Sequence, residues 1–224
     1  SARVHMRLPY PTVLFDLDGT LLDTIGIIVE SMRHSVQHHM GYTPSPEQLV
    51  AGVGTPLIDQ VREHAARHDP TVDDHTVQSM AATYVSHNRA IHDARVSAYP
   101  GAGDALESLR SRGARMAIVT SKPVDIASRG LELCGLREYF ELVIGSDSVT
   151  RHKPDPEPVH AALHRMGVPG SRAVFIGDSP HDMRSGRAAG VSTGAALWGP
   201  FSRQALGPTQ PSYWLDDVPA IAGL

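Results

Sequence analysis

The sequence has little cysteine and no long apolar run. Cys134 is the only cysteine among 224 residues, which excludes a disulfide within the chain and is typical of a reducing compartment. No apolar stretch approaches the roughly 18 residues that a membrane-spanning helix needs. The start of the chain, Ser1 to Met6, lacks the apolar core of a secretory signal, and residues before Met6 need not be native. We therefore expect a cytoplasmic protein with no membrane partner.

The chain is also poor in aromatic residues and has no excess of positive charge. Aromatic residues make up 5% of the sequence and the formal net charge is −4. No basic patch and no run of arginines interleaved with aromatics occurs, so we expect no nucleic-acid partner. With 41% hydrophobic and 20% charged residues, the composition is that of an ordinary globular protein.

Two aspartates follow an apolar run near the start of the chain. Residues 13–15 have strand character, and Asp16 and Asp18 come directly after them, before Gly19. Side chains two apart on a strand point the same way, so the carboxylates leave the strand end as a pair unless the backbone turns. Such a pair repels unless a cation binds or one member is protonated. Both arrangements suit phosphoryl transfer; the alternative is an ordinary Asp/Gly turn.

Two further segments contain groups that bind anions. The apolar strand predicted over residues 115–119 is followed by three polar donors, Thr120, Ser121 and Lys122. Such a strand end offers hydroxyl and N–H donors to an anion, or else its hydroxyls cap a helix that begins near Val124. Lys153 precedes three prolines at alternate positions, which stiffen the chain and hold its side chain in one direction. The alternative for Lys153 is a solvated surface charge.

A fourth segment brings two more carboxylates. Residues 173–176 form another apolar strand, Gly177 and Asp178 follow it, and Asp182 lies four residues further on. A carboxylate at the strand end and one in the first turn of a helix can converge on one cation. The alternative is that Asp178 caps a helix that starts with Pro180.

These four segments, in this order and at these separations, resemble the motifs of the haloacid dehalogenase superfamily of phosphatases. The resemblance covers nearly the whole chain, from about Pro11 to Ala222. It implies that Asp16 is the nucleophile and Asp18 the general acid and base. It also implies that Thr120 binds the transferring phosphoryl group and that Lys153 screens charge between this group and the nucleophile.

The same resemblance implies Mg²⁺ as the cofactor. Its implied ligands are Asp16, the backbone carbonyl of Asp18, and Asp178, with Asp182 binding or orienting the metal shell. We expect the substrate to contact residues from the strand ends and from a helical insertion, namely Thr120, Ser121, Lys122, Lys153, Gly52 and Thr55. Whether His181 also contacts the substrate stays open at this point.

Strands that alternate with helices predict an α/β fold, a doubly wound parallel sheet with a Rossmann-like core. We assign residues 8–23 and 95–224 to this core. Residues 24–94 resemble the helical cap that the family inserts after its first motif. Helices are predicted at Ile25–Met40, Pro56–Arg67 and Asp74–Ala90. The predicted hinges are Asp23–Thr24 and Asp93–Ser97, and residues 51–56 are the candidate specificity loop.

We therefore predict a Mg²⁺-dependent phosphatase that hydrolyses a small phosphomonoester through an aspartyl-phosphate and is most similar to the phosphoglycolate phosphatase-like group. The alternatives are a pyrophosphatase of the same superfamily, a β-phosphoglucomutase-like phosphotransferase and a non-enzymatic phosphate-binding module. Relatives of the mutase usually carry Glu where this chain has Gly177, which argues against that activity. The sequence sets neither the physiological substrate nor the oligomeric state.

Overall fold

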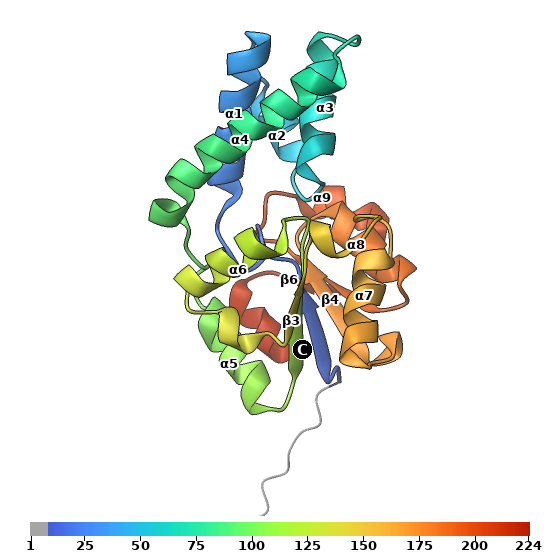
Figure 1. Ribbon diagram of the computed structural model, residues 1–224. Coiled ribbons are helices and arrows are strands. Elements are labelled where there is room, and N and C mark those ends of the chain that lie inside the picture. Colours follow the sequence, from blue (N-terminus) through green and yellow to red (C-terminus); the bar gives the residue numbers. More distant parts are fainter. Residues whose placement is uncertain (1–8) are drawn as a thin grey trace, which may run out of the picture.

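The computed structural model describes residues 9–224, which form an α/β fold around one parallel sheet (Figure 1). The segment before Met6, discussed above, lies outside the described residues. The six strands run parallel in the order β3-β2-β1-β4-β5-β6. They are β1 (Thr12–Phe15), β2 (Arg115–Val119), β3 (Leu142–Ile144), β4 (Ala173–Gly177), β5 (Ser192–Ala196) and β6 (Tyr213–Leu215). The predicted fold class is confirmed.

Helices cover both faces of the sheet. They are α5 (Ala102–Ser111), α6 (Val124–Leu133), α7 (Glu157–Met166), α8 (Pro180–Ala188) and α9 (Arg203–Leu206). Val13 and Phe15 of β1 pack in a cluster with side chains of α5 and α6, whereas Leu14 packs in a second cluster with α7. Side chains alternate along a strand, so a central strand buried on both faces is apolar at every position. No helix among residues 9–224 is both long and apolar enough to cross a membrane.

Four helices separate β1 from α5, and we call them the insert: α1 (Ile25–Met40), α2 (Pro46–Ala51), α3 (Leu57–His68) and α4 (Asp74–Arg95). In Figure 1 the insert stands beyond the carboxyl ends of the strands. It has its own hydrophobic core, in which Met32, Val61 and Met80 are buried. Helix α1 ends at Gly41, whose φ of 69° is the left-handed conformation that glycine adopts without strain.

Several elements differ from the predictions, among them α2, β6 and α4. Helix α2 and strand β6 were not predicted, because each is short: six residues and three residues, respectively. Helix α4 runs to Arg95 rather than Ala90. Its last turn is held by contacts that a local pattern does not reveal, since Arg95 pairs with Glu30 of α1 at 2.7 Å and His92 is buried.

The two chain segments that join the insert to the sheet lie side by side. Asp23 N–H donates to the Ser97 carbonyl at 2.8 Å, and Tyr99 N–H donates to the Leu21 carbonyl at 2.9 Å. The second predicted hinge therefore begins inside α4, and its extended part starts after Arg95. That the insert moves as a separate domain about these segments stays a prediction.

Candidate active site

Asp16 is the first residue after β1 and lies buried at the carboxyl end of the sheet. Its N–H donates to the Ile176 carbonyl of β4 at 2.8 Å, so the strand pairing extends one residue past β1. Its Oδ1 accepts a hydrogen bond from Lys153 Nζ at 2.8 Å. Burial and the carboxylate of Asp182 raise the pKa of Asp16 to about 7, against the opposing effect of Lys153.

Lys153 reaches this site from the loop between β3 and α7, and its side chain is 1% exposed. Its Nζ also donates to Asp182 Oδ1 at 2.6 Å and to the Val119 carbonyl at 3.3 Å. Burial disfavours the ammonium, but the carboxylates of Asp16 and Asp182 outweigh this effect and raise the pKa of Lys153. The alternative of a solvated surface charge is therefore wrong.

Three carboxylates meet at one point beneath the strand ends. One oxygen each of Asp16, Asp178 and Asp182 lies within 4.8 Å of the others. Thr20 Oγ1 donates to Asp178 Oδ1 at 2.8 Å, whereas Asp178 Oδ2 is buried and has no hydrogen-bond partner within residues 9–224. Burial, followed by the charges of Asp16 and Asp182, raises the pKa of Asp178 well above its usual range. This donor set fits Mg²⁺, because hard cations prefer carboxylate oxygens.

Glycines make room for these carboxylates. A Cβ at Gly19 would lie 2.7 Å from Asp178 Oδ2, and one at Gly177 would lie 2.5 Å from Asp182 Cβ. Gly19 also has a φ of 85°, a conformation that other residues rarely adopt. At these two positions the backbone lies closer to the carboxylates than a residue with a Cβ atom would permit.

Asp182 is fixed by the start of α8 as well as by Lys153. Its Oδ2 accepts the backbone N–H of Ser179 at 3.0 Å and the Ser179 hydroxyl at 2.7 Å. Ser179, followed by Pro180, is the N-cap of α8. The alternative that Asp178 caps this helix is therefore wrong, and one oxygen of Asp178 has no partner in the described part of the chain.

Asp18 lies close to Asp16 but has different partners. Its Oδ1 accepts hydrogen bonds from Thr24 Oγ1 and from Lys122 Nζ, both at 2.5 Å. Asp16 and Asp18 both border one cavity, and the charge of Asp18 adds to the raised pKa of Asp16. The Asp18 side chain is 13% exposed and borders a cavity. This position suits a group that exchanges protons with a substrate.

Thr120 lies at the end of β2, and its hydroxyl accepts a hydrogen bond but donates none within residues 9–224. Its oxygen accepts the Lys122 N–H at 3.2 Å, which leaves the hydroxyl free to donate into the cavity. The N-cap of α6 is Pro123, without a side-chain cap, and the Val124 N–H donates to Asp147 Oδ1 at 3.0 Å. The helix-cap alternative for the strand-end hydroxyls is therefore wrong.

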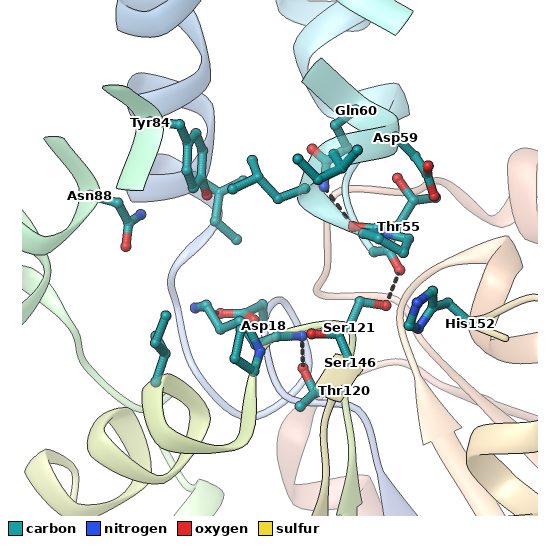
Figure 2. A pocket seen from close by; sticks show the side chains of 18 of the residues that line it. Asp18, Thr55, Asp59, Gln60, Tyr84, Asn88, Thr120, Ser121, Ser146 and His152 are labelled. Carbon is teal, nitrogen blue, oxygen red and sulfur yellow. Dashed lines mark hydrogen bonds and ion pairs between the residues drawn. The ribbon is translucent and has the colours of Figure 1, made fainter. Parts of the chain in front are cut away.

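The segment between α2 and α3 touches the sheet end through one hydrogen bond. Ser121 Oγ donates to the Gly54 carbonyl at 2.6 Å (Figure 2). Thr55 borders the cavity, whereas Gly52 does not, and contact of Thr55 with a substrate stays a prediction. Gly52 faces the Gln60 side chain instead, because a Cβ there would lie 3.2 Å from Gln60 Cγ. The placement of Gly52 therefore does not support contact with a substrate.

A cavity of about 550 Å³ lies between the strand ends and the insert (Figure 2). Its floor is polar and contains Asp16, Asp18, Thr120, Ser121, Lys122 and His152. Its remaining walls are largely apolar and come from α1, α3, α4 and α6; they include Ile28, Leu57, Ile58, Tyr84, Val85 and Ile126. The structure thus collects residues from distant parts of the chain around one space.

Sequence reasoning missed several of these residues. Thr20 donates a hydrogen bond to Asp178 and Thr24 donates one to Asp18, but no role was predicted for Thr20, and Thr24 was predicted only as part of a hinge. Tyr84 and Asn88 share one face of α4 at i, i+4 spacing, a weak signal that identified nothing by itself.

His181 is partly buried against the turn at Gly54 and is not among the cavity-lining residues. A Cβ at Gly54 would lie 3.9 Å from His181 Cδ2. Burial lowers the pKa of His181. This placement gives His181 a contact with the insert rather than with the cavity.

Comparisons with known proteins identify the family of the chain. Residues 13–196 match the family model described as haloacid dehalogenase-like hydrolase. The chain is 37% identical over 215 residues to pyrophosphatase PpaX of Bacillus pumilus, covering 95% of this chain and 96% of that protein. It is 33% identical over 210 residues to pyrophosphatase PpaX of Halalkalibacterium halodurans, covering 94% of each.

A solved structure shows the same fold at lower identity. The crystal structure of a predicted phosphoglycolate phosphatase from Haemophilus somnus superposes with a TM-score of 0.86 at 20% identity, covering 96% of this chain and 97% of that one. At this identity the likeness concerns the fold alone. The family match spans most of the chain, and the curated relatives exceed 30% identity over nearly their full length. The chain therefore belongs to the haloacid dehalogenase-like hydrolases.

Proposed function

We propose that the protein is a Mg²⁺-dependent phosphatase that hydrolyses a small phosphomonoester through an aspartyl-phosphate on Asp16. The observation that carries the proposal is the position of Asp16, which is paired with Lys153, clustered with two further carboxylates and open to a cavity that Asp18 also borders. This arrangement supplies a nucleophile, a charge partner, a cation site and a proton donor at one place.

The proposed cation ligands are Asp16, Asp178 and the backbone carbonyl of Asp18, with Asp182 orienting the group. Three carboxylates against the one ammonium of Lys153 leave an excess of negative charge, which is the chemical reason for a cation here. When bound, Mg²⁺ neutralises phosphate oxygens and reduces their repulsion from the carboxylate nucleophile.

The reaction proceeds in two steps on the side chains of this site. Asp16 forms a bond to phosphorus as the bond to the leaving oxygen breaks, and Asp18 donates a proton to that oxygen. Asp18 then takes a proton from water, whose oxygen bonds to phosphorus as the Asp16–phosphorus bond breaks and inorganic phosphate forms. Lys153 and the free hydroxyl proton of Thr120 bind the phosphoryl oxygens in both steps.

Pyrophosphate hydrolysis is the second candidate, and the names of the curated relatives favour it. A β-phosphoglucomutase-like transfer is less well supported, because Gly177 carries no carboxylate and lies directly against Asp182. A non-enzymatic phosphate-binding role is the least supported, since each of the four motifs retains its reactive group. A cytoplasmic location and a small phosphorylated substrate belong to the same proposal.

The test is to measure inorganic phosphate release from 2-phosphoglycolate, β-glucose 1-phosphate with a bisphosphate primer, and pyrophosphate, each with Mg²⁺ and with EDTA. We expect Mg²⁺-dependent release from monoesters and inhibition by Ca²⁺, whose looser coordination holds nucleophile and phosphate out of line. Acid quenching with a labelled ester should leave label on the peptide that contains Asp16. Formation of glucose 6-phosphate without hydrolysis, or no release from any substrate, would contradict the proposal.

A further inference from the structure

The walls of the cavity above the floor are largely apolar, whereas pyrophosphate would place a second, charged phosphate group against them. The side chains of Ile28 on α1, Leu57 and Ile58 on α3, Val85 on α4 and Ile126 on α6 line it. Burying a charged group against such side chains has a high desolvation cost unless a counter-charge accompanies it. The apolar walls therefore favour a part of the substrate that is itself apolar.

Positive charge in the cavity is scarce. Of the lining residues, Lys122 and Arg89 are the ones with a permanent positive charge, and His152 adds one only when it is protonated. Lys122 is paired with Asp18 at 2.5 Å, and Arg89 is exposed on α4. Two acidic residues, Asp59 and Asp147, line the same cavity. A leaving group with several negative charges would meet little compensation beyond the floor.

The volume points in the same direction. A cavity of about 550 Å³ is far larger than a phosphoryl group alone, and it falls in the range of roughly 300–1,000 Å³ typical of sites for organic ligands. A phosphoryl group held at Asp16 and Thr120 would leave most of this volume to whatever is attached to it. The leaving group must fill this volume if it is to exclude water from the reaction.

Two polar groups on α4 interrupt the apolar walls. Figure 2 shows Tyr84 and Asn88 projecting from α4 toward the cavity. Tyr84 lines the cavity, and burial, followed by the charge of Asp18, raises the pKa of its hydroxyl and keeps it protonated. Asn88 donates one hydrogen bond to Ser31 Oγ at 3.3 Å, which leaves its carbonyl oxygen to accept another. These groups offer hydrogen bonds to a hydroxyl or carbonyl of a ligand.

We infer that this cavity selects phosphate monoesters of an uncharged alcohol with an apolar body and one or two hydrogen-bonding groups, in preference to pyrophosphate. The inference rests on the proposed phosphatase activity and names its substrate class. In the reaction, the bond from phosphorus to the alcohol oxygen breaks, the alcohol leaves with a proton from Asp18, and water later releases phosphate from Asp16.

A series of n-alkyl phosphates from methyl to hexyl tests the inference, because the leaving alcohols are nearly equal in basicity and differ mainly in apolar length. We expect kcat/KM to rise about two- to fourfold for each added methylene until the cavity is filled. The longer esters should also exceed pyrophosphate and 2-phosphoglycolate under the same conditions.

Matched variants identify which wall of the cavity contacts the alkyl chain of the ester. Ile126→Ala and Leu57→Ala should each lower the ratio of hexyl to methyl phosphate hydrolysis about five- to tenfold, because each removes apolar contact with the chain. Leu133→Ala is the control: Leu133 lies on α6 like Ile126 but is 42% exposed and outside the cavity. It should leave the ratio unchanged.

Binding of n-alkylphosphonates, whose carbon–phosphorus bond is not hydrolysed, separates this inference from the proposed function. A Kd that falls with chain length, measured by calorimetry, supports the inference even if no ester is turned over, an outcome that would contradict the phosphatase proposal alone. A flat series in both turnover and binding overturns the inference. So does a preference for pyrophosphate that Arg89→Ala abolishes, although hydrolysis itself would then still stand.

Discussion

The floor of the cavity and the insert above it are built in opposite ways. At the floor, Asp16 is buried and is joined through Lys153 to Asp182 by hydrogen bonds of 2.6–2.8 Å, so each charge has a fixed position. The insert contributes mainly apolar side chains, and its segment before α3 contacts the floor through one hydrogen bond, from Ser121 to Gly54. Buried polar networks specify geometry, whereas apolar walls specify shape and volume. We therefore expect the sheet to determine the reaction and the insert to determine the choice of substrate.

The largest effect is expected from Asp16→Asn, which disables the floor while leaving the insert intact. The amide is a poor nucleophile toward phosphorus, so kcat should fall by at least about 10³-fold. Asp104→Asn, at an exposed carboxylate on α5, is the control and should keep full turnover. Steady-state phosphate release measures both, and an Asp16 variant that retained a few per cent of activity would disprove covalent catalysis at this residue.

The next largest effect is expected when a glycine is replaced by alanine beside the carboxylate cluster, compared with the same replacement in the insert. In Gly177→Ala the new methyl would lie 2.5 Å from Asp182 Cβ, so Asp182 and its bond to Lys153 must shift. We expect a loss of about 2 kcal/mol in the free energy of unfolding, together with a lower kcat. Gly26→Ala in the first turn of α1 has no atom within 4 Å of its new methyl and should cost nothing. Urea unfolding of both variants tests whether only the floor is tightly packed.

The Asp178→Asn variant tests whether the carboxylate cluster of Asp16, Asp178 and Asp182 carries excess negative charge, through the pH dependence of stability. The pKa of Asp178 is raised in the folded protein, so that state binds more protons than the unfolded one, and stability falls as pH rises from about 4 through the raised pKa. Asn does not titrate, and it offers N–H donors where Asp178 Oδ2 has no partner within residues 9–224.

Without divalent cations, the Asn variant should therefore unfold like wild type near pH 4 and be about 1–3 kcal/mol more stable at pH 8. Adding Mg²⁺ should stabilise wild type more than the variant. Thermal unfolding across pH, with and without Mg²⁺, measures both differences. Equal stability at pH 8 would show that the carboxylate cluster carries no excess charge.

The smallest effect is expected where the two regions touch. Ser121→Ala removes the 2.6 Å hydrogen bond to Gly54, which contributes about 1 kcal/mol. We expect KM to rise up to about fivefold with kcat within about twofold, because Asp16, Asp18 and Lys153 are unchanged. Ser111→Ala, at an exposed serine of α5, provides the control. A loss of kcat as large as that of Asp16→Asn would mean that the insert takes part in the reaction itself.

The sequence by itself determined the strands that end at the site and the side chains placed there. Apolar runs at β1, β2 and β4 are buried on both faces, so their pattern is local and strong, and the polar residues that follow them lie at one edge of a parallel sheet. Asp16, Asp18, Thr120 and Asp178 were placed together on this basis, and the role of each stays a prediction.

Only the tertiary structure decided which residues complete the site. Tyr84 and Asn88 line the cavity, whereas Gly52 lies outside it against Gln60. Ser121 donates a hydrogen bond to Gly54 of the insert, a residue far away in the chain. In the last turn of α4, Arg95 likewise pairs with Glu30 of α1, a residue far away in the chain. Periodicity and turn residues describe neighbours along the chain, whereas the orientation of the insert over the sheet depends on packing between its four helices and the strand ends.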